Sequence, residues 1–154
     1  MAIQTTRTIA GPLATGKVNK REAGVLEFAS QIASVIWNHT RDGGAVGTLS
    51  LGTALPANAV ITRAWADVQT AATSGGSATF SLVAGSTTVL AATAFDNANN
   101  GINVVGVQTL KNDAVGSGFE ALKVAASSEL KLVIAGAALT AGKVRLAVEF
   151  YISK

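Results

Sequence analysis

Apolar and polar residues alternate most regularly near the C-terminus of the chain. From residue 144 to residue 152 every second position is apolar, and the positions between them include the charged residues Arg145 and Glu149. An alternation with a period of two is typical of a β-strand that is buried on one face. We therefore predict a final strand whose buried face is formed by Val144, Leu146, Val148, Phe150 and Ile152.

Residues 55–82 carry the pattern of a second pair of strands. A Pro56/Asn58 turn precedes a long β-prone run, and Ser74-Gly75-Gly76 interrupts it. An alternating stretch follows, in which Phe80 and Leu82 are apolar. Two β-prone runs joined by a short glycine-containing turn are typical of an antiparallel β-hairpin, which we predict here.

A second hairpin is predicted around Asp42-Gly43, because this dipeptide favours tight turns between strands. The stretch before it is ambiguous, since residues 22–36 contain an apolar stripe at helical spacing but end in the β-prone Val35-Ile36-Trp37. We favour a strand from about Ser34, with a short helix or extended segment before it. The return strand contains Val46, Leu49 and Leu51.

The remaining pattern continues in short strands separated by turns. Asn97 to Gly101 is predicted as a turn, and Leu130, Leu132 and Ile134 share one face of a strand. Eight or nine short strands predict an all-β protein, an antiparallel β-sandwich of jelly-roll type with an extended N-terminal arm. The predicted division is an arm over residues 1–21 and a β-sandwich domain over residues 22–154.

The composition points to buried contacts with partner subunits. Charged residues make up 14% of the chain, hydrophobic residues 49%, and the mean hydropathy is +0.40. Soluble domains usually carry about 25% charged residues. Part of the surface is therefore expected to pack against partner subunits. The alternative is a soluble sandwich rich in Ala, Ser and Thr.

Positive charge is concentrated at the N-terminus. Residues 1–21 contain four basic residues and no acidic one, whereas residues 22–154 hold the other eight of the twelve basic residues and all nine acidic ones. No aromatic residue lies between these charges, so we do not expect nucleic acid as the partner. The favoured partner is an acidic neighbouring protein, and the alternative is a solvated tail. The candidate contact residues are Arg7, Lys17, Lys20 and Arg21.

The sequence predicts no membrane anchor and no secretion signal. The longest strongly apolar run, Leu132 to Leu139, is much shorter than the roughly 20 residues of a membrane-spanning helix. No apolar segment of the kind found in secretory signals lies at the N-terminus. The chain contains no cysteine, so it has no disulfide and no thiolate metal site. We expect synthesis in a cytoplasm.

Three motifs have some features of chemical sites but lack the residues that such sites need. His39 is the single histidine and is expected to be a partly exposed strand residue. The segment Gly11–Lys17 has the spacing of a phosphate-binding loop, but Val18 replaces the Ser/Thr that would hold Mg²⁺. Asp96–Gly101 resembles part of a Ca²⁺ loop, but Ala98 occupies a ligand position, so a turn is favoured. We predict no catalytic residue, no metal and no cofactor.

Several stretches together resemble small virion proteins of tailed bacteriophages, of the head decoration or cement kind. The resemblance covers about residues 21–153 and depends on turns and strands, not on an active-site motif. Its main stretches are residues 42–52 (DGGAVGTLSLG), 55–65 (LPANAVITRAW), 73–79 (TSGGSAT), 139–144 (LTAGKV) and 149–151 (EFY).

This resemblance implies a non-enzymatic β-sandwich, often oligomeric, that binds the outside of a capsid at junctions between major capsid proteins. The expected partners are the major capsid protein and further copies of the chain, most simply as a homotrimer. The expected location is the capsid surface of the virion. The alternative is a tail or head-fibre component with a host- or carbohydrate-binding face, which exposed clusters of Trp37, Trp65 and Tyr151 would support. No individual functional residue is carried over from the family.

Overall fold

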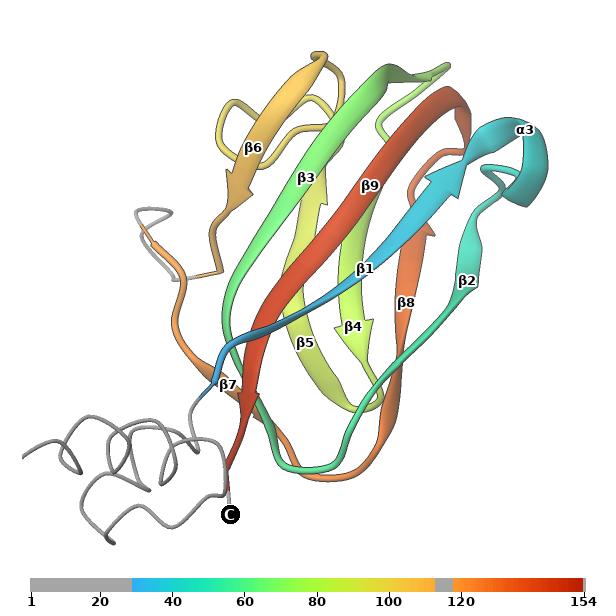
Figure 1. Ribbon diagram of the computed structural model, residues 1–154. Helices are drawn as coiled ribbons and strands as arrows, with labels where there is room; N and C mark the ends of the chain where they lie inside the picture. Colours follow the sequence, from blue (N-terminus) through green and yellow to red (C-terminus); the bar gives the residue numbers. More distant parts are fainter. Residues whose placement is uncertain (1–28, 113–117, 154) are drawn as a thin grey trace, which may run out of the picture.

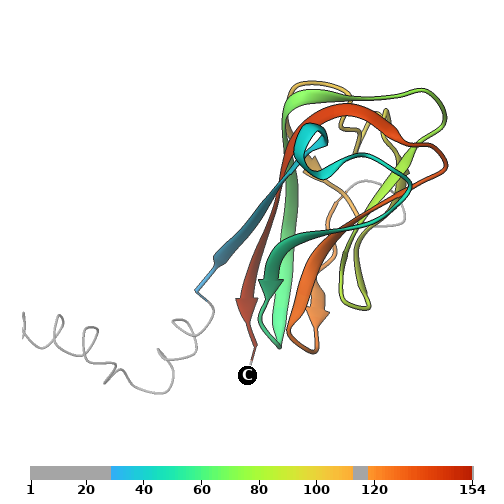
Figure 2. The same cartoon turned by 90° about the vertical axis from the view of Figure 1, so that its right-hand side faces the viewer.

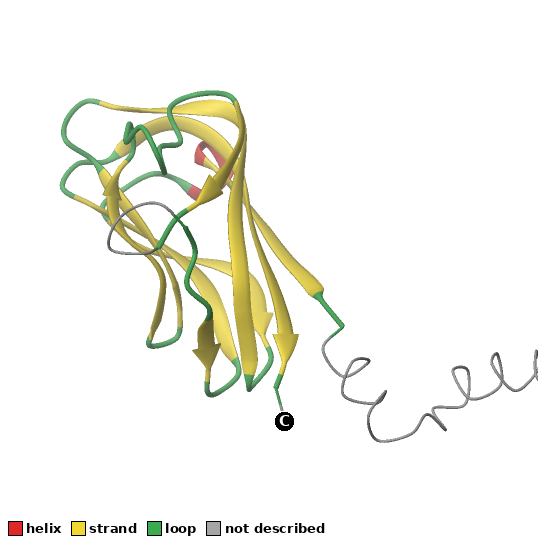
Figure 3. Cartoon of the chain, turned by 90° about the vertical axis from the view of Figure 1, so that its left-hand side faces the viewer, coloured by secondary structure: helices red, strands yellow, loops and turns green. Residues whose placement is uncertain are grey.

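Two antiparallel sheets pack face to face in the computed structural model, which describes residues 29–112 and 118–153 (Figures 1 and 2). The first sheet has the order β1-β9-β3-β6, with the short β7 also paired to β3, and the second has the order β2-β8-β4-β5. In these described residues nearly all of the regular secondary structure is strand, apart from one helical turn (Figure 3). The prediction of an all-β antiparallel sandwich is confirmed. The elements are β1 (Gln31–Asn38), α3 (His39–Asp42), β2 (Gly47–Leu55), β3 (Ala59–Ser74), β4 (Thr79–Ala84), β5 (Thr87–Ala94), β6 (Gly106–Leu110), β7 (Leu122–Val124), β8 (Ser128–Ala135) and β9 (Leu139–Ile152).

The order of the strands in the two sheets can be compared with that of a jelly roll. The first and last strands, β1 and β9, are neighbours in the first sheet, and all strand pairs are antiparallel. When β7 is left aside, four strands remain in each sheet. This arrangement is compatible with a jelly roll, which has two sheets and eight strands, and the jelly-roll type stays a prediction. The proposed arm, residues 1–21, lies outside the described residues.

Strand β9 lies at the centre of the first sheet and matches the predicted alternation. It pairs with β1 on one side and with β3 on the other. Its inward side chains Val144, Leu146, Val148 and Phe150 are at most 5% exposed. Ile152, at the end of the strand, is 38% exposed. The predicted buried face of β9 is therefore confirmed for Val144 through Phe150, and Ile152 is the exception.

Both predicted hairpins are wrong. β3 and β4 belong to different sheets, as do β1 and β2, so neither pair shares a hydrogen-bonded ladder. The Ser74 hydroxyl donates to Ala138 O at 2.8 Å and thereby ties the β3–β4 connection to the β8–β9 connection. Each strand must bury one face against the opposite sheet, and these connections carry the chain between the two layers. A turn sequence marks the reversal but does not say whether the chain changes sheet.

The segment around Asp42-Gly43 forms a helical turn instead of a hairpin loop. His39 begins this turn, so the prediction that it is a strand residue is wrong, although it is partly exposed. The Asn38 side chain caps the turn by accepting from Thr40 N at 3.1 Å. Gly43 ends it with a φ of 76°, which a glycine adopts without strain.

The start of β1, the turn at Asn97–Gly101 and the buried face of β8 were also predicted from the sequence. β1 begins at Gln31, three residues before the predicted start at Ser34, since its ladder with β9 already includes the pair Gln31–Phe150. The residues 22–28 lie outside the described part of the chain. The predicted turn at Asn97–Gly101 is confirmed, since Gly101 N donates to Asn97 O at 2.7 Å. Leu130, Leu132 and Ile134 share the buried face of β8, as predicted.

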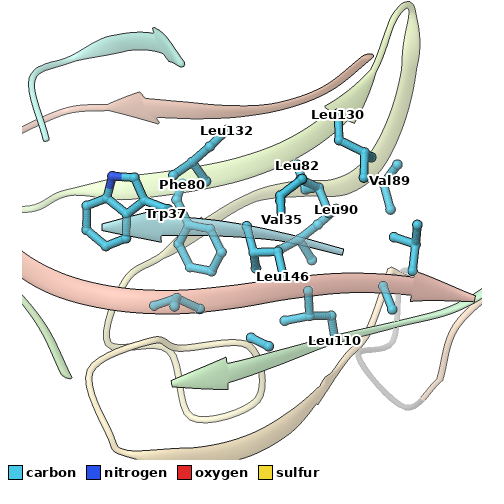
Figure 4. Close-up of a cluster of buried hydrophobic side chains, with 14 of the residues drawn as sticks. Val35, Trp37, Phe80, Leu82, Val89, Leu90, Leu110, Leu130, Leu132 and Leu146 are labelled. Carbon is cyan, nitrogen blue, oxygen red and sulfur yellow. The ribbon is translucent and has the colours of Figure 1, made fainter. Parts of the chain in front are cut away.

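Trp37 is the largest side chain in the core, and it is completely buried between the sheets (Figure 4). Its indole N–H donates to Gly43 O at 2.8 Å, which satisfies the one polar atom of the ring. Gly142 on β9 lies against the ring with a φ of +137°, and a Cβ there would come within 2.7 Å of Trp37 Cζ3. The ring therefore needs glycine at position 142.

The Asp42 carboxylate holds the same end of the sandwich. It accepts from Asn38 N at 2.8 Å and pairs with Arg41 Nε at 2.7 Å. The hydrogen bond from Arg41, helped by that from Asn38 N, lowers the pKa of Asp42 below its ordinary value of 3.8 against the opposing effect of partial burial. The charged form of Asp42 thus stabilises the helical turn that follows β1.

Gly142→Ala is expected to lower the free energy of unfolding by about 3 kcal/mol, because the methyl group meets Trp37 and the backbone remains at positive φ. Urea unfolding followed by tryptophan fluorescence measures the change. Gly47→Ala is the matched control, since Gly47 has a φ of +147° and open space around its Cβ position. Equal losses in the two variants would contradict the packing argument.

Asp42→Asn is expected to lower the free energy of unfolding by about 1 kcal/mol at pH 7. The folded pKa of Asp42 lies below its unfolded value of 3.8, so its stabilisation is present above that pH and is lost as the pH falls through the folded pKa. The difference between the two proteins should therefore shrink as the pH falls well below 3.8. Urea titrations at pH 7 and at pH 2.5 test this, and a difference independent of pH would contradict it.

Candidate binding surface

The described residues contain no arrangement that suggests a reaction centre. No group of three or more His, Cys, Asp or Glu side chains lies close enough to hold a metal ion in residues 29–112 and 118–153. His39 packs edge-on against Trp37, with 6.5 Å between the ring centroids. The nearby Asp42 carboxylate is engaged by Arg41 and by Asn38 N. His39 and Asp42 thus have structural contacts, and no nucleophile of the described part of the chain is hydrogen-bonded to either of them.

The outward side of the first sheet is the most distinctive surface of the molecule, and we call it the outer face. Along β3, Ala64, Ala66 and Val68 are buried, so the alternate residues Arg63, Trp65 and Asp67 point outward. The register carries this face across to the neighbouring strands. Trp65 lies opposite Thr109 on β6 and Ala147 on β9, and Asp67 lies opposite Val107 and Arg145.

A shallow open hollow lies on the outer face where β3 meets β6. It has a volume of about 160 Å³ and is lined by Arg63, Trp65, Val107 and Thr109. The Arg63 guanidinium carbon lies 5.8 Å from the centroid of the Trp65 ring, in a cation–π contact. Such contacts stabilise exposed sites by about 0.5–1 kcal/mol. The contact fixes the cation beside the hollow.

The centre of the outer face carries the small residue Ala147 and charged side chains of both signs. Ala147, opposite Trp65, is only 2% exposed although it points outward, so its larger neighbours cover it. Arg63 lies opposite Glu149, and Arg145 lies opposite Asp67, so charges of both signs alternate. No salt bridge within 4.0 Å joins these pairs; in the described residues the ion pair is Arg41–Asp42. The face can accept a flat partner without a net charge mismatch.

Exposed apolar side chains gather beside the hollow. Val104, Val105 and Val107 are 59%, 64% and 73% exposed, and they lie in or just before β6. Single exposed apolar side chains are ordinary, but three lie here within four residues of the chain, and Val107 lines the hollow together with Trp65. We call residues 104–107 the valine patch.

The structure tests only part of the site predicted from sequence. Arg7, Lys17, Lys20 and Arg21 lie outside the described residues, as does the glycine-containing segment 11–17. Asp96–Gly101 is a turn in which the Asn97 side chain accepts from Asn99 N at 2.8 Å, as the sequence favoured.

The three aromatic residues whose exposed cluster would support the alternative function do not form a cluster. Trp37 is buried in the core, while Trp65 and Tyr151 are half-buried and lie on the outer face. The register places Tyr151 four residues along β9 from Ala147, which lies opposite Trp65, and this corresponds to about 13 Å. The three aromatic side chains therefore do not supply the surface that a carbohydrate-binding face would use.

Sequence reasoning missed the hollow and the valine patch. The alternation of Arg63, Trp65 and Asp67 with buried residues could have indicated an outward-facing tryptophan. The partner strand β6 could not have been found this way, because its pairing with β3 joins residues about forty positions apart in the chain.

No helix in the described residues is long and apolar enough to cross a membrane.

Comparison with solved structures finds the same fold in two phage particles. A chain in the acidic stable capsid structure of Helicobacter pylori bacteriophage KHP30 superposes with a TM-score of 0.55 and 12% sequence identity, covering 82% of this chain and 90% of that one. A chain of the cyanophage Pam1 capsid asymmetric unit gives a TM-score of 0.53 and 17% identity, covering 82% and 87%. No protein-family model and no curated protein sequence matches the chain. At these identities the likeness shows a common fold, which covers most of both chains.

Proposed function

We propose that this protein is a structural component of a phage virion that binds the outer capsid surface and stabilises the head as a decoration protein. The observation that carries the proposal is the shared fold with chains in two phage capsid structures, over more than four-fifths of each chain. The sequence resemblance to head decoration proteins supports it independently. The absence of a candidate reaction centre among the described residues agrees with a role in binding.

The surface fits a protein that works by contact. The outer face is wide, carries balanced charges and includes a hollow and an apolar patch. A decoration protein spans a junction between capsid subunits, so that its contacts must break before those subunits separate. Several weak contacts on one rigid body then add up to strong binding, because each contact raises the effective concentration of the next.

The partner in this proposal is the major capsid protein, and the assembly is a homotrimer. Each trimer carries three copies of every binding element, so even a modest contact is multiplied. The four basic residues of the N-terminal segment, Arg7, Lys17, Lys20 and Arg21, are the proposed contacts with capsid carboxylates. Charge-assisted hydrogen bonds of this kind are about twice as strong as neutral ones.

Deletion of residues 1–21 is expected to abolish binding to undecorated shells of the cognate major capsid protein while leaving the β-sandwich folded. Co-sedimentation of the protein with shells measures binding, and circular dichroism with tryptophan fluorescence reports the fold. Unchanged binding by the folded deletion variant would overturn the assignment of the arm.

Charge variants separate the basic groups from the length of the arm. Replacing all four basic residues by Gln is expected to weaken shell binding at least tenfold and to flatten its dependence on salt. The matched control replaces Arg7 and Arg21 by Lys and Lys17 and Lys20 by Arg, which keeps the charge. Equal binding by the Gln variant and the control would show that the charges do not carry the contact.

A further inference from the structure

Four edge strands lack the features that normally keep sheet edges apart. β1 and β6 end the hydrogen-bonded order of the first sheet, where the short β7 shares the β3 edge with β6, and β2 and β5 end the second. None of these four strands contains a charged residue or a proline, whereas β3, β7, β8 and β9 carry all the charged residues found in strands. Soluble proteins usually place charges or proline on edges, because an unpaired edge is a template for another strand.

The edge of β1 is partly covered within the molecule. The Thr53 hydroxyl donates to Ser34 O at 3.3 Å, and the Arg41 guanidinium donates to Ile36 O. These side chains occupy carbonyl groups of β1. The side of the sandwich formed by β1 and β2 therefore supplies some partners for its own edge.

The edge of β6 has no such cover in the described residues. The backbone hydrogen bonds of Gly106–Leu110 are those of its ladder with β3, and no other backbone or side-chain bond to these residues is formed within the described part of the chain. Asn100 bonds to both backbone groups of Lys111 and so closes the C-terminal end of the strand. Within the described residues, the five residues of β6 thus carry no further hydrogen bond along their outer edge, and Figure 1 shows β6 beside β3 at the edge of the sheet. Val107 of β6 belongs to the valine patch, and Val107 and Thr109 line the hollow.

We propose that this edge pairs with β6 of a second copy of the chain, antiparallel and about a two-fold axis at Gln108. The uncharged strand Gly-Val-Gln-Thr-Leu causes no charge repulsion when it meets itself. All five residues pair only when Gln108 lies opposite Gln108 of the second copy. The glutamine amide carries both donors and acceptors and can therefore bond to its own kind.

In this register the exposed Val107 of each copy lies close to the hollow of the other copy. With Gln108 at the axis, Val107 of one copy lies opposite Thr109 of the other, and strands in a sheet are about 4.8 Å apart. Val107 and Thr109 both point to the outer face, where Thr109 lines the hollow beside Trp65. The 73% exposed Val107 of each copy thus comes to the open side of the hollow of the other copy.

This pairing goes beyond the proposed function, since it does not involve the arm or the capsid protein. On a decorated shell it would join neighbouring units edge to edge through an isologous contact, in which each copy contributes the same surface. A five-residue ladder is short, so the contact is expected to be weak in solution and to gain from the high local concentration on a particle.

Single cysteine variants test the register, because the chain has no cysteine of its own. Gln108→Cys places two thiols opposite each other across the axis, within the 4.5–5.5 Å between Cβ atoms of facing residues. Thr109→Cys is the matched control, since it lies opposite Val107 and not opposite itself. In the full chain under mild oxidation, Gln108→Cys should form a disulfide-linked dimer at least ten times faster than Thr109→Cys.

That comparison is strict because Thr109 is exposed and Gln108 is half-buried, so random collisions would favour the control. A rate for Gln108→Cys equal to or below that of Thr109→Cys would overturn the proposal. Circular dichroism shows that both variants are folded before oxidation.

A second variant pair keeps the test independent of the cysteine chemistry. Val107→Lys adds a charge at a position that is 73% exposed and should remove the two-fold association, whereas Val107→Thr keeps a β-branched, uncharged side chain and should retain it. Light scattering over a range of concentrations measures the mass. A mass that rises from three to six chains in the original protein and stays at three in Val107→Lys supports both the trimer and the edge pair.

The other outcomes separate the two proposals. A rise from one to two chains that Val107→Lys abolishes supports the edge pair and contradicts the trimer. A mass that is the same for the original protein and Val107→Lys at every concentration contradicts the edge pair, whatever the number of chains.

Discussion

The packing of Trp37 between the two sheets is the constraint on which the rest of this fold depends. The indole fills the end of the sandwich where β1 turns into α3 and where β9 begins its long run. Its N–H is satisfied by Gly43 O, and the ring approaches β9 so closely that position 142 must be glycine. A large rigid side chain in a core of Val, Leu and Ala fixes the distance and register of its neighbours.

That anchoring has a consequence for the outer face. β9 is held by Trp37 through Gly142 on its inner side and pairs with both β1 and β3. β3 in turn carries Arg63 and Trp65, and it holds β6 along one edge. The hollow and the valine patch are therefore positioned by a continuous ladder that begins at the core. Backbone pairing thus holds the hollow in place, together with the contact between Arg63 and Trp65.

The sequence predicted the strands better than their pairing. Strict alternation marked β9 and β8, because the two faces of a half-buried strand differ in polarity. The hairpins at Asp42-Gly43 and Ser74-Gly75-Gly76 were wrong, because glycine-containing turns serve equally well when the chain returns in the same sheet and when it crosses to the other. The hollow depends on which distant strand lies beside β3, and β6 carries no alternation clear enough to reveal it. The four basic residues of the arm stay a prediction.

The few charged residues of the strands are unevenly distributed over the two sheets. The charges of the strands lie on β3, β8 and β9 and on the short β7, whereas the edge strands β1, β2, β5 and β6 carry none. A protein that works alone in solution would be expected to distribute charge in the opposite way. Low total charge and four uncharged edge strands agree with the proposed role, in which parts of the surface are covered in an assembly.

The most direct test of the proposed capsid-stabilising role compares the thermal stability of shells with and without this protein. Undecorated shells of the cognate major capsid protein are saturated with the full chain, and the temperature at which they come apart is followed by light scattering. We expect the decorated shells to disassemble at a higher temperature, with bound protein that co-sediments at a fixed stoichiometry. Shells that bind no protein, or that bind it and come apart at an unchanged temperature, would contradict a stabilising role.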